Sequence, residues 1–271
     1  MNYLQIAFET VNKEECEILI ALLADKGFES FEEAEKSLKA FIKEDDFKED
    51  SFEEILHIIP VKYTITTVAQ QNWNAQWESS FEPIIVDDFV AIRAAFHQPV
   101  QNVQHEIIIT PKMSFGTGHH ATTYMMINQM QGLDFENKTV VDFGTGTAVL
   151  AILAEKMGAV TIDAIDYDDW SIENSIENAA ANSCTNINLI KAETILPGKL
   201  YDIILANINL NVIQSNLAAI RASSKEGTLI LLSGFLKTDE MILLKALSTY
   251  GISHKFTLQK DNWICLLTEM N

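Results

Sequence analysis

Cysteine is scarce in this chain, and its few cysteines form no pattern. Only 3 occur among 271 residues, at positions 16, 184 and 265. An odd number of widely separated thiols predicts neither a disulfide framework nor a zinc site, and favours a reducing, cytoplasmic environment. His119 and His120 are adjacent, which is poor spacing for metal ligands, so we expect no bound metal.

Long apolar runs are also absent. No stretch approaches the roughly 18 residues that span a membrane, and the first residues lack the features of a signal peptide. The sequence therefore predicts no membrane contact. Its hydrophobic content of 48% over 271 residues is enough for one large domain or two smaller ones.

Basic residues are in short supply. The chain has 19 lysines and arginines against 38 acidic residues, which gives a net charge of −19. Because nucleic-acid binding needs a basic face, we expect no direct contact with nucleic acid. Residues 1–60 hold 12 Glu and 4 Asp against 6 Lys, a net charge of −10. This acidity favours a docking surface for a basic partner, although a charge that serves solubility alone fits the composition as well.

Residues 139–158 are the most informative stretch. Residues 139–143 are apolar and partly β-branched, as in a strand covered on both faces, and residues 149–157 have helical apolar spacing. Gly144 and Gly146 between them allow a sharp turn and close approach to a ligand. A strand that feeds a helix through a glycine turn is typical of the nucleotide-binding corner of a doubly wound sheet.

The residues around this turn favour S-adenosylmethionine over a dinucleotide. Asp142 precedes the turn, where it would repel a pyrophosphate, and Val149 replaces the third glycine of a dinucleotide motif. S-adenosylmethionine carries a sulfonium and an ammonium, which an acid suits. Asp166 ends the next predicted strand, 160–165, where a carboxylate accepts hydrogen bonds from ribose hydroxyls. A tight turn with a solvated aspartate remains the simpler alternative.

The first 68 residues predict a small ferredoxin-like domain. Apolar periodicity gives the order strand, helix, strand, strand, helix, strand at residues 1–9, 13–26, 28–33, 37–42, 51–59 and 61–68. Ser51 and Glu54 have the spacing of a capping box for the second helix. Residues 69–82 form a linker, in which a short helix would place Trp73 and Trp77 on one side, most simply for packing.

Residues 83–271 predict the larger domain. After short strands at 84–86, 89–94 and 106–110 comes a glycine- and hydroxyl-rich loop, 111–123, that contains Phe115 and Thr117 and leads into a helix at 121–130 with Thr123 in its first turn. The alternative, a loop that only caps this helix, does not explain so much glycine. Further helices are expected at 169–182 and 239–249, and strands at 187–190, 201–208, 228–234, 252–259 and 263–268. This alternation predicts an α/β fold with a mostly parallel sheet, and Asn207 at a strand end faces its ligand crevice.

Several of these segments resemble the bacterial family that methylates large-subunit ribosomal protein L-eleven, the PrmA family. The shared segments are 115–123, 142–147, 206–208 and 233–234, together with Trp73, Trp77 and 81–83. The resemblance implies a ferredoxin-like recognition domain followed by a class I, Rossmann-like methyltransferase domain. It also implies methylation of the α-amine and lysine ε-amines of a basic ribosomal protein.

By this resemblance, Asn207 lies nearest the reacting centre. The donor would be bound by Thr123, Gly144, Asp166 and Asn207, and also by Phe115, Thr117, Asp142 and Gly146. No general base is evident, so positioning of a neutral amine is expected to carry the reaction. Three alternatives share part of the pattern: a class I methyltransferase for another protein or a small amine, an inactive S-adenosylmethionine-binding regulator, and a nicotinamide oxidoreductase.

The chain departs from the family pattern at four places. Ala148 replaces a glycine of the turn, Thr145 replaces a common cysteine, and Ala121 stands where proline or glutamate is usual. Residues 209–212 lack a frequent proline. We interpret Ala148 as narrowing the site near the methionine moiety, and the change at 209–212 as affecting contacts with the methyl acceptor.

Overall fold

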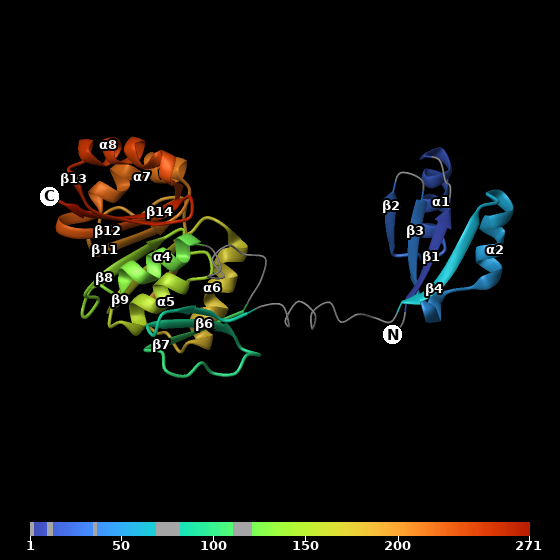
Figure 1. Cartoon of the computed structure of the whole chain (residues 1–271), viewed down its shortest axis with the longest axis horizontal. Coiled ribbons are helices and arrows are strands. Elements are labelled where there is room, and N and C mark those ends of the chain that lie inside the picture. The colour runs from blue at the N-terminus through green and yellow to red at the C-terminus, as the bar shows by residue number, and fades with distance from the viewer. Residues whose placement is uncertain (1–2, 10–12, 35–36, 69–81, 111–120) are drawn as a thin grey trace. The chain divides into compact units, whose positions relative to one another are not determined.

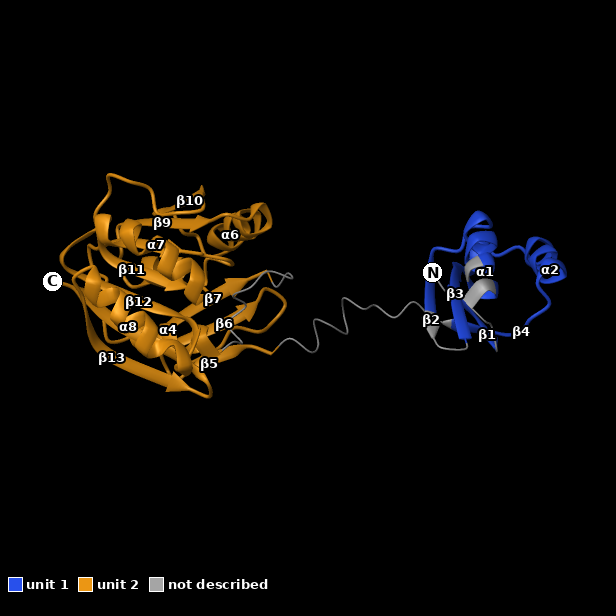
Figure 2. Cartoon of the chain, turned by 90° about the horizontal axis from the view of Figure 1, so that it is seen from above, with its two compact units in different colours: residues 1–80 blue, residues 81–271 orange. Residues whose placement is uncertain are grey.

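The computed structural model describes residues 3–9, 13–34, 37–68, 82–110 and 121–271. The chain divides into two compact units, Met1–Ser80 and Phe81–Asn271, which Figure 2 shows in different colours. The expected linker helix with Trp73 and Trp77 lies outside the described residues, and so does the loop at 111–120 with Phe115 and Thr117.

The first unit is a four-stranded antiparallel sheet with two helices (Figure 1). Its elements are β1 (Tyr3–Glu9), α1 (Lys13–Asp25), β2 (Ser30–Ala34), β3 (Ser37–Lys43), the short 3-10 helix η1 (Glu44–Asp46), α2 (Glu49–Ile58) and β4 (Lys62–Val68). The strand order is β2-β3-β1-β4, and each neighbouring pair is antiparallel. The predicted ferredoxin-like order is confirmed.

Alternation along β1 explains the core of this unit. Leu4, Ile6 and Phe8 are buried, while the residues between them are partly exposed. The same core takes Leu19 and Leu23 from α1, which are four residues apart and therefore on one helix face.

The start of α2 differs from the sequence prediction. The helix begins at Glu49, and its N-cap Lys48 makes no side-chain capping bond. Ser51 therefore lies inside the helix, and the predicted capping box is wrong. Glu49 and Asp50 in the first turn suit the positive end of the helix dipole, so the helix extends back past Ser51. Glu54 instead pairs with Lys26, at 2.9 Å.

The second unit is built on a seven-stranded sheet in the order β10-β9-β8-β11-β12-β14-β13. Its strands are β8 (Thr139–Phe143), β9 (Thr161–Asp166), β10 (Ile187–Lys191), β11 (Tyr201–Asn207), β12 (Ser224–Leu236), β13 (Ile252–Lys260) and β14 (Trp263–Met270). The first five in this spatial order run parallel, and β14 is antiparallel to both of its neighbours. The predicted, mostly parallel α/β sheet is confirmed.

Helices cover both faces of this sheet (Figure 1). One apolar core joins α4 (Ala121–Met130) and α5 (Val149–Lys156) to alternate residues of the central strands, including Val140 and Leu205. The other joins α7 (Leu210–Ala222) and α8 (Glu240–Thr249) to the intervening residues, including Val141 and Ile204. A strand buried on both faces needs apolar residues at consecutive positions, which Val140 and Val141 of β8 provide.

The remaining elements flank this layered body. A small sheet of β5 (Ile84–Val86), β6 (Val90–Ala94) and β7 (His105–Ile109) precedes α4. Helix α6 (Asp169–Ala181) follows β9, and the 3-10 helix η2 (Lys237–Asp239) precedes α8. Helix α7 was not expected from the sequence. None of the helices in the described part of the chain is long and apolar enough to cross a membrane.

The order of the strands determines where a ligand can bind. From β8 the chain moves outward through β9 to β10, and then returns to β11 on the other side of β8. Such a reversal opens a crevice at the carboxyl ends of the two central strands. Asn207 ends β11 and Gly144 follows β8, while Asp166 ends the neighbouring strand β9.

Candidate functional site

The glycine turn after β8 is fixed by the backbone of β9. The amides of Gly144 and Thr145 both donate to the carbonyl of Ile165, at 2.8 and 2.9 Å. Gly144 and Gly146 have φ values of 77° and 57°. These left-handed conformations cost glycine little, and they leave the turn bare toward the crevice.

Asp166 ties the end of β9 to the turn. Its Oδ2 accepts a hydrogen bond from the amide of Gly146 at 2.9 Å, and its Oδ1 accepts one from the amide of Asp168 at 3.1 Å. Each carboxylate oxygen keeps further acceptor capacity. Asp166 lines the cavity described below, so this capacity is available to a ligand.

Asp142 lies behind the turn, which corrects the expectation that it faces a ligand. Its side chain is 1% exposed, and it is not among the residues that line the cavity. Its Oδ2 accepts from Oγ1 of Thr145 at 2.6 Å and from the amide of Ala151 at 3.2 Å. Burial raises the pKa of this carboxyl to about 7. The turn curls over Asp142, so this residue shapes the backbone that a ligand would contact.

Asn207 is brought next to Thr123 from a distant part of the chain. Its Nδ2 donates to Oγ1 of Thr123 at 3.2 Å. The Oδ1 of Asn207 is buried and has no hydrogen-bond partner among the described residues. A buried acceptor without a partner is costly, which is a reason to look for a ligand donor at this position.

These strand ends surround a cavity of about 510 Å³, a volume typical of small-molecule sites. Five of the predicted residues line it: Thr123, Gly144, Gly146, Asp166 and Asn207. The lining also contains residues that were not predicted as site residues, including Tyr167, Glu193, Ile208 and Trp263. Tyr167 follows Asp166 directly and is 72% exposed. The sequence could have predicted its place in the cavity, because it is an aromatic residue beside the expected ribose-binding carboxylate.

Asn178 of α6 connects the residue after β7 to the glycine turn, and Asn182, the C-cap of α6, bonds to β7 and not to the turn. Asn178 accepts from the amide of Thr110 at 2.7 Å and donates to the carbonyl of Thr147 at 2.9 Å. Asn182 exchanges two hydrogen bonds with the backbone of Ile108, at 2.9 and 2.6 Å. Asn178 therefore ties Thr110 to the glycine turn.

The structure shows the local roles of two of the four departures from the family pattern, Ala148 and Asn209. Ala148 is the N-cap of α5 in a left-handed conformation, with φ 62°. It is fully buried and does not line the cavity, so the expected narrowing near the methionine moiety is wrong. Asn209 caps α7, where its Oδ1 accepts from the amide of Val212 at 3.0 Å. A helix can therefore begin there without a proline.

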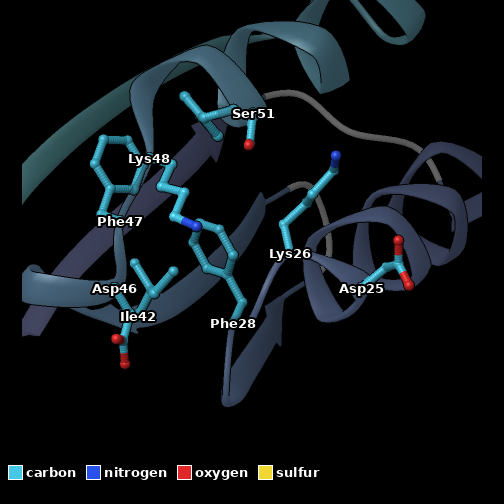
Figure 3. Close-up of a pocket in the computed structure, with 9 residues that line it drawn as sticks. Asp25, Lys26, Phe28, Ile42, Asp46, Phe47, Lys48 and Ser51 are labelled. Carbon is cyan, nitrogen blue, oxygen red and sulfur yellow. The ribbon is translucent and has the colours of Figure 1, made fainter.

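A second cavity, of about 210 Å³, lies within the first unit (Figure 3). Phe28, Phe52 and Ile42 form its apolar part, and Lys26 and Lys48 also line it. Asp25 and Asp46 balance the two lysines. This balanced lining has none of the features that point to a ligand in the larger cavity.

A reversed parallel sheet, a glycine turn and an acidic residue at the end of the next strand fit a class I methyltransferase, and Val149, in place of a third glycine, does not fit a dinucleotide-binding protein. The sequence profile of the family "Ribosomal protein L11 methyltransferase (PrmA)" matches residues 5–271. The chain belongs to this family.

Relatives and a solved structure agree with this assignment. The chain is 36% identical to the ribosomal protein L11 methyltransferase of Phocaeicola vulgatus, over 97% of each protein. It is 38% identical to that of Chlorobaculum parvum, over 99% of this chain and 96% of the relative. The crystal structure of a ribosomal protein L11 methylase from Lactobacillus delbrueckii subsp. bulgaricus superposes with a TM-score of 0.66 and 27% identity. That match covers 70% of this chain and 100% of the other.

Proposed function

We propose that this methyltransferase transfers methyl groups from S-adenosylmethionine to amines of ribosomal protein L11, namely its N-terminal α-amine and lysine ε-amines. The buried Oδ1 of Asn207 carries the proposal, because it offers an unused acceptor on the cavity wall to an amine N–H. The names of the relatives, which share nearly the whole chain, support this substrate.

The cavity fits the methyl donor at three places. Asp166 has acceptor capacity for ribose hydroxyls, and the bare backbone of Gly144 and Gly146 allows the donor to approach closely. Thr123 lies beside Asn207, on the side where the methionine portion would bind. When bound, S-adenosylmethionine supplies an activated methyl group on a positively charged sulfur. Phe115 and Thr117 are proposed donor contacts on the family resemblance alone.

The acceptor amine must be neutral to attack, although a free lysine has a pKa of about 10.4. A cavity that excludes water favours the neutral form, because burial disfavours an ammonium. Asn207 then acts by orientation, since Oδ1 accepts one amine hydrogen and directs the lone pair. Its own direction is held by the bond from Nδ2 to Thr123. No residue is assigned as a general base.

We propose a division of labour along the chain. Residues 1–68 recognise the basic protein, residues 69–82 link the domains, and residues 83–271 carry out the reaction. The proposal is supported by the net charge of −10 on residues 1–60. All the cavity residues named above belong to the second compact unit.

Mass spectrometry of the ribosomal protein after incubation with enzyme and S-adenosylmethionine tests the proposal. Wild-type enzyme should add whole methyl groups to the N-terminus and to lysines. Asn207→Ala should lower kcat by about 100-fold, because the amine loses its orientation, and should change donor affinity little. Methylation of other proteins or small amines, but not of this one, would overturn the substrate. An unchanged kcat with only a lower Tm would make Asn207 a structural residue.

A further inference from the structure

Ile208 lies between two glycines that come from different strands. A Cβ atom added at Gly144 would lie 2.1 Å from Cγ2 of Ile208. A Cβ added at Gly234 would lie 2.4 Å from the carbonyl oxygen of Ile208 and 2.8 Å from its nitrogen. Atoms cannot approach this closely, so the side chain of Ile208 requires glycine at 144 and its backbone requires glycine at 234.

The backbone of Ile208 is also fixed on both sides. Its amide donates to the carbonyl of Ser233 at 3.0 Å, which extends the pairing of β11 with β12. The next residue, Asn209, is the N-cap of α7. Ile208 is therefore a fixed point between the end of β11 and the start of a helix.

All the residues of this arrangement face the same cavity. Gly144, Asn207, Ile208 and Gly234 line its wall. A β-branched side chain such as isoleucine has few accessible χ1 rotamers, so it makes a stiff wall. The contact of Cγ2 with Gly144 sets the separation between the glycine turn and the strand end that carries Asn207.

We propose that Ile208 is a positioning residue, whose Cγ2 methyl sets the distance between the glycine turn and the Asn207 amide. This inference rests on the proposed function, in which the turn holds the methyl donor and Asn207 orients the amine. Displacement at sulfur needs an in-line approach, and a misplacement of about 1 Å can cost about 100-fold in rate. A side chain that fixes this separation should therefore affect kcat more than affinity.

Ile208→Ala removes the contact and provides the first test. We expect kcat to fall at least tenfold, while the dissociation constant for S-adenosylhomocysteine, measured by calorimetry, changes less than threefold. Ile208→Val keeps a methyl at the Cγ2 position and should restore kcat to within about threefold of the wild type. Leu210→Ala is the matched control, because Leu210 packs in the adjacent core and does not line the cavity.

A double substitution tests the contact itself, with thermal unfolding as a second measurement. Gly144→Ala should lower both kcat and Tm, because its Cβ meets Cγ2 of Ile208. Adding Ile208→Ala removes that atom, so the double variant should recover part of both losses; the strain of alanine at φ 77° remains. Wild-type kcat in Ile208→Ala, or additive losses in the double variant, would overturn the inference. Absence of methyl transfer by the wild type would instead overturn the proposed function.

Discussion

At the scale of single residues, two aspartates of the second unit have opposite pKa shifts because their surroundings differ. Asp142 is buried behind the turn, and burial raises its pKa to about 7. Asp202 is also desolvated. Its bonds to Lys225 and to the amide and hydroxyl of Thr139 outweigh that effect and lower its pKa to about 2. The two carboxyls should therefore affect stability in different ranges of pH.

The free energy of unfolding of Asp142→Asn, relative to that of the wild type, should increase steadily as the pH rises from about 4 to about 7. In this window the unfolded chain releases the proton of Asp142 while the folded chain keeps it, so wild-type stability falls with pH relative to a residue that does not titrate. The difference should change by about 1.4 kcal/mol per pH unit and level off above pH 7.

Denaturant unfolding at pH 5 and pH 8 measures this difference, and Asp202→Asn is the control. A lowered folded-state pKa gives stability that is present above about pH 4 and is lost only as the pH falls toward 2. The effect of Asp202→Asn should therefore be the same at pH 5 and pH 8. A constant offset for Asp142→Asn as well would mean that Asp142 titrates normally in the folded protein.

Ala148 should tolerate glycine better than its burial suggests. A left-handed alanine costs roughly 1–2 kcal/mol, and glycine relieves that strain. Two effects of the substitution destabilise the fold by about the same amount, and so cancel this gain: the loss of a buried methyl and the extra conformational freedom of glycine in the unfolded chain. Ala148→Gly should therefore be within about 0.5 kcal/mol of the wild type, whereas Ala154→Gly, inside α5, should cost about 1.5–2 kcal/mol. Equal losses in chemical denaturation would contradict this account.

At the scale of elements, periodicity predicted the strands and most helices, because each is apolar on a face that the fold buries. Helix α7 was not predicted, because its first half contains Asn and Ser, which have weak helix propensity. Its apolar residues Ile213, Leu217 and Ile220 nevertheless have helical spacing. Ser215 and Asn216 both donate to the carbonyl of Val212. Such bonds within a helix are hard to foresee from composition.

Part of the candidate site was also predicted from the spacing of residues along the strands. Spacing placed Asp166 and Asn207 at strand ends, and parallel strands bring such ends together. Spacing did not determine on which side of the turn the carboxylate of Asp142 lies, because that depends on the φ values of Gly144 and Gly146. The role of Ile208 was not predicted, because it depends on close contacts with two glycines that are distant in sequence.

The link between α6 and the turn leads to a prediction with a built-in control. Asn178→Ala leaves the buried carbonyl of Thr147 and the partly buried amide of Thr110 unpaired, and should cost about 1–3 kcal/mol of stability. Asn182→Ala loses two bonds to Ile108 of β7, but none to the turn. Only Asn178→Ala should therefore weaken S-adenosylhomocysteine binding, as measured by calorimetry. Equal loss of affinity in both variants would refute a specific link to the turn.

At the scale of the whole molecule, the two units have separate cores. One core cluster belongs wholly to the first unit, and the other two belong wholly to the second, among the described residues. Residues 1–60 carry −10 of the total charge of −19. A basic protein would be attracted by this field, which salt screens over about 8–10 Å.

Deleting residues 1–68 should therefore separate donor binding from recognition. The shortened enzyme keeps both cores of the second unit and the cavity, so its affinity for S-adenosylhomocysteine should remain within about twofold of the intact chain. It should lose methylation of the intact ribosomal protein. Added salt should imitate this loss in the full-length enzyme by lowering kcat/KM more than kcat, because it weakens encounter and leaves the bound complex unchanged. Wild-type turnover of the intact substrate by the shortened enzyme would show that recognition lies elsewhere, and the acidity of residues 1–60 would then serve solubility.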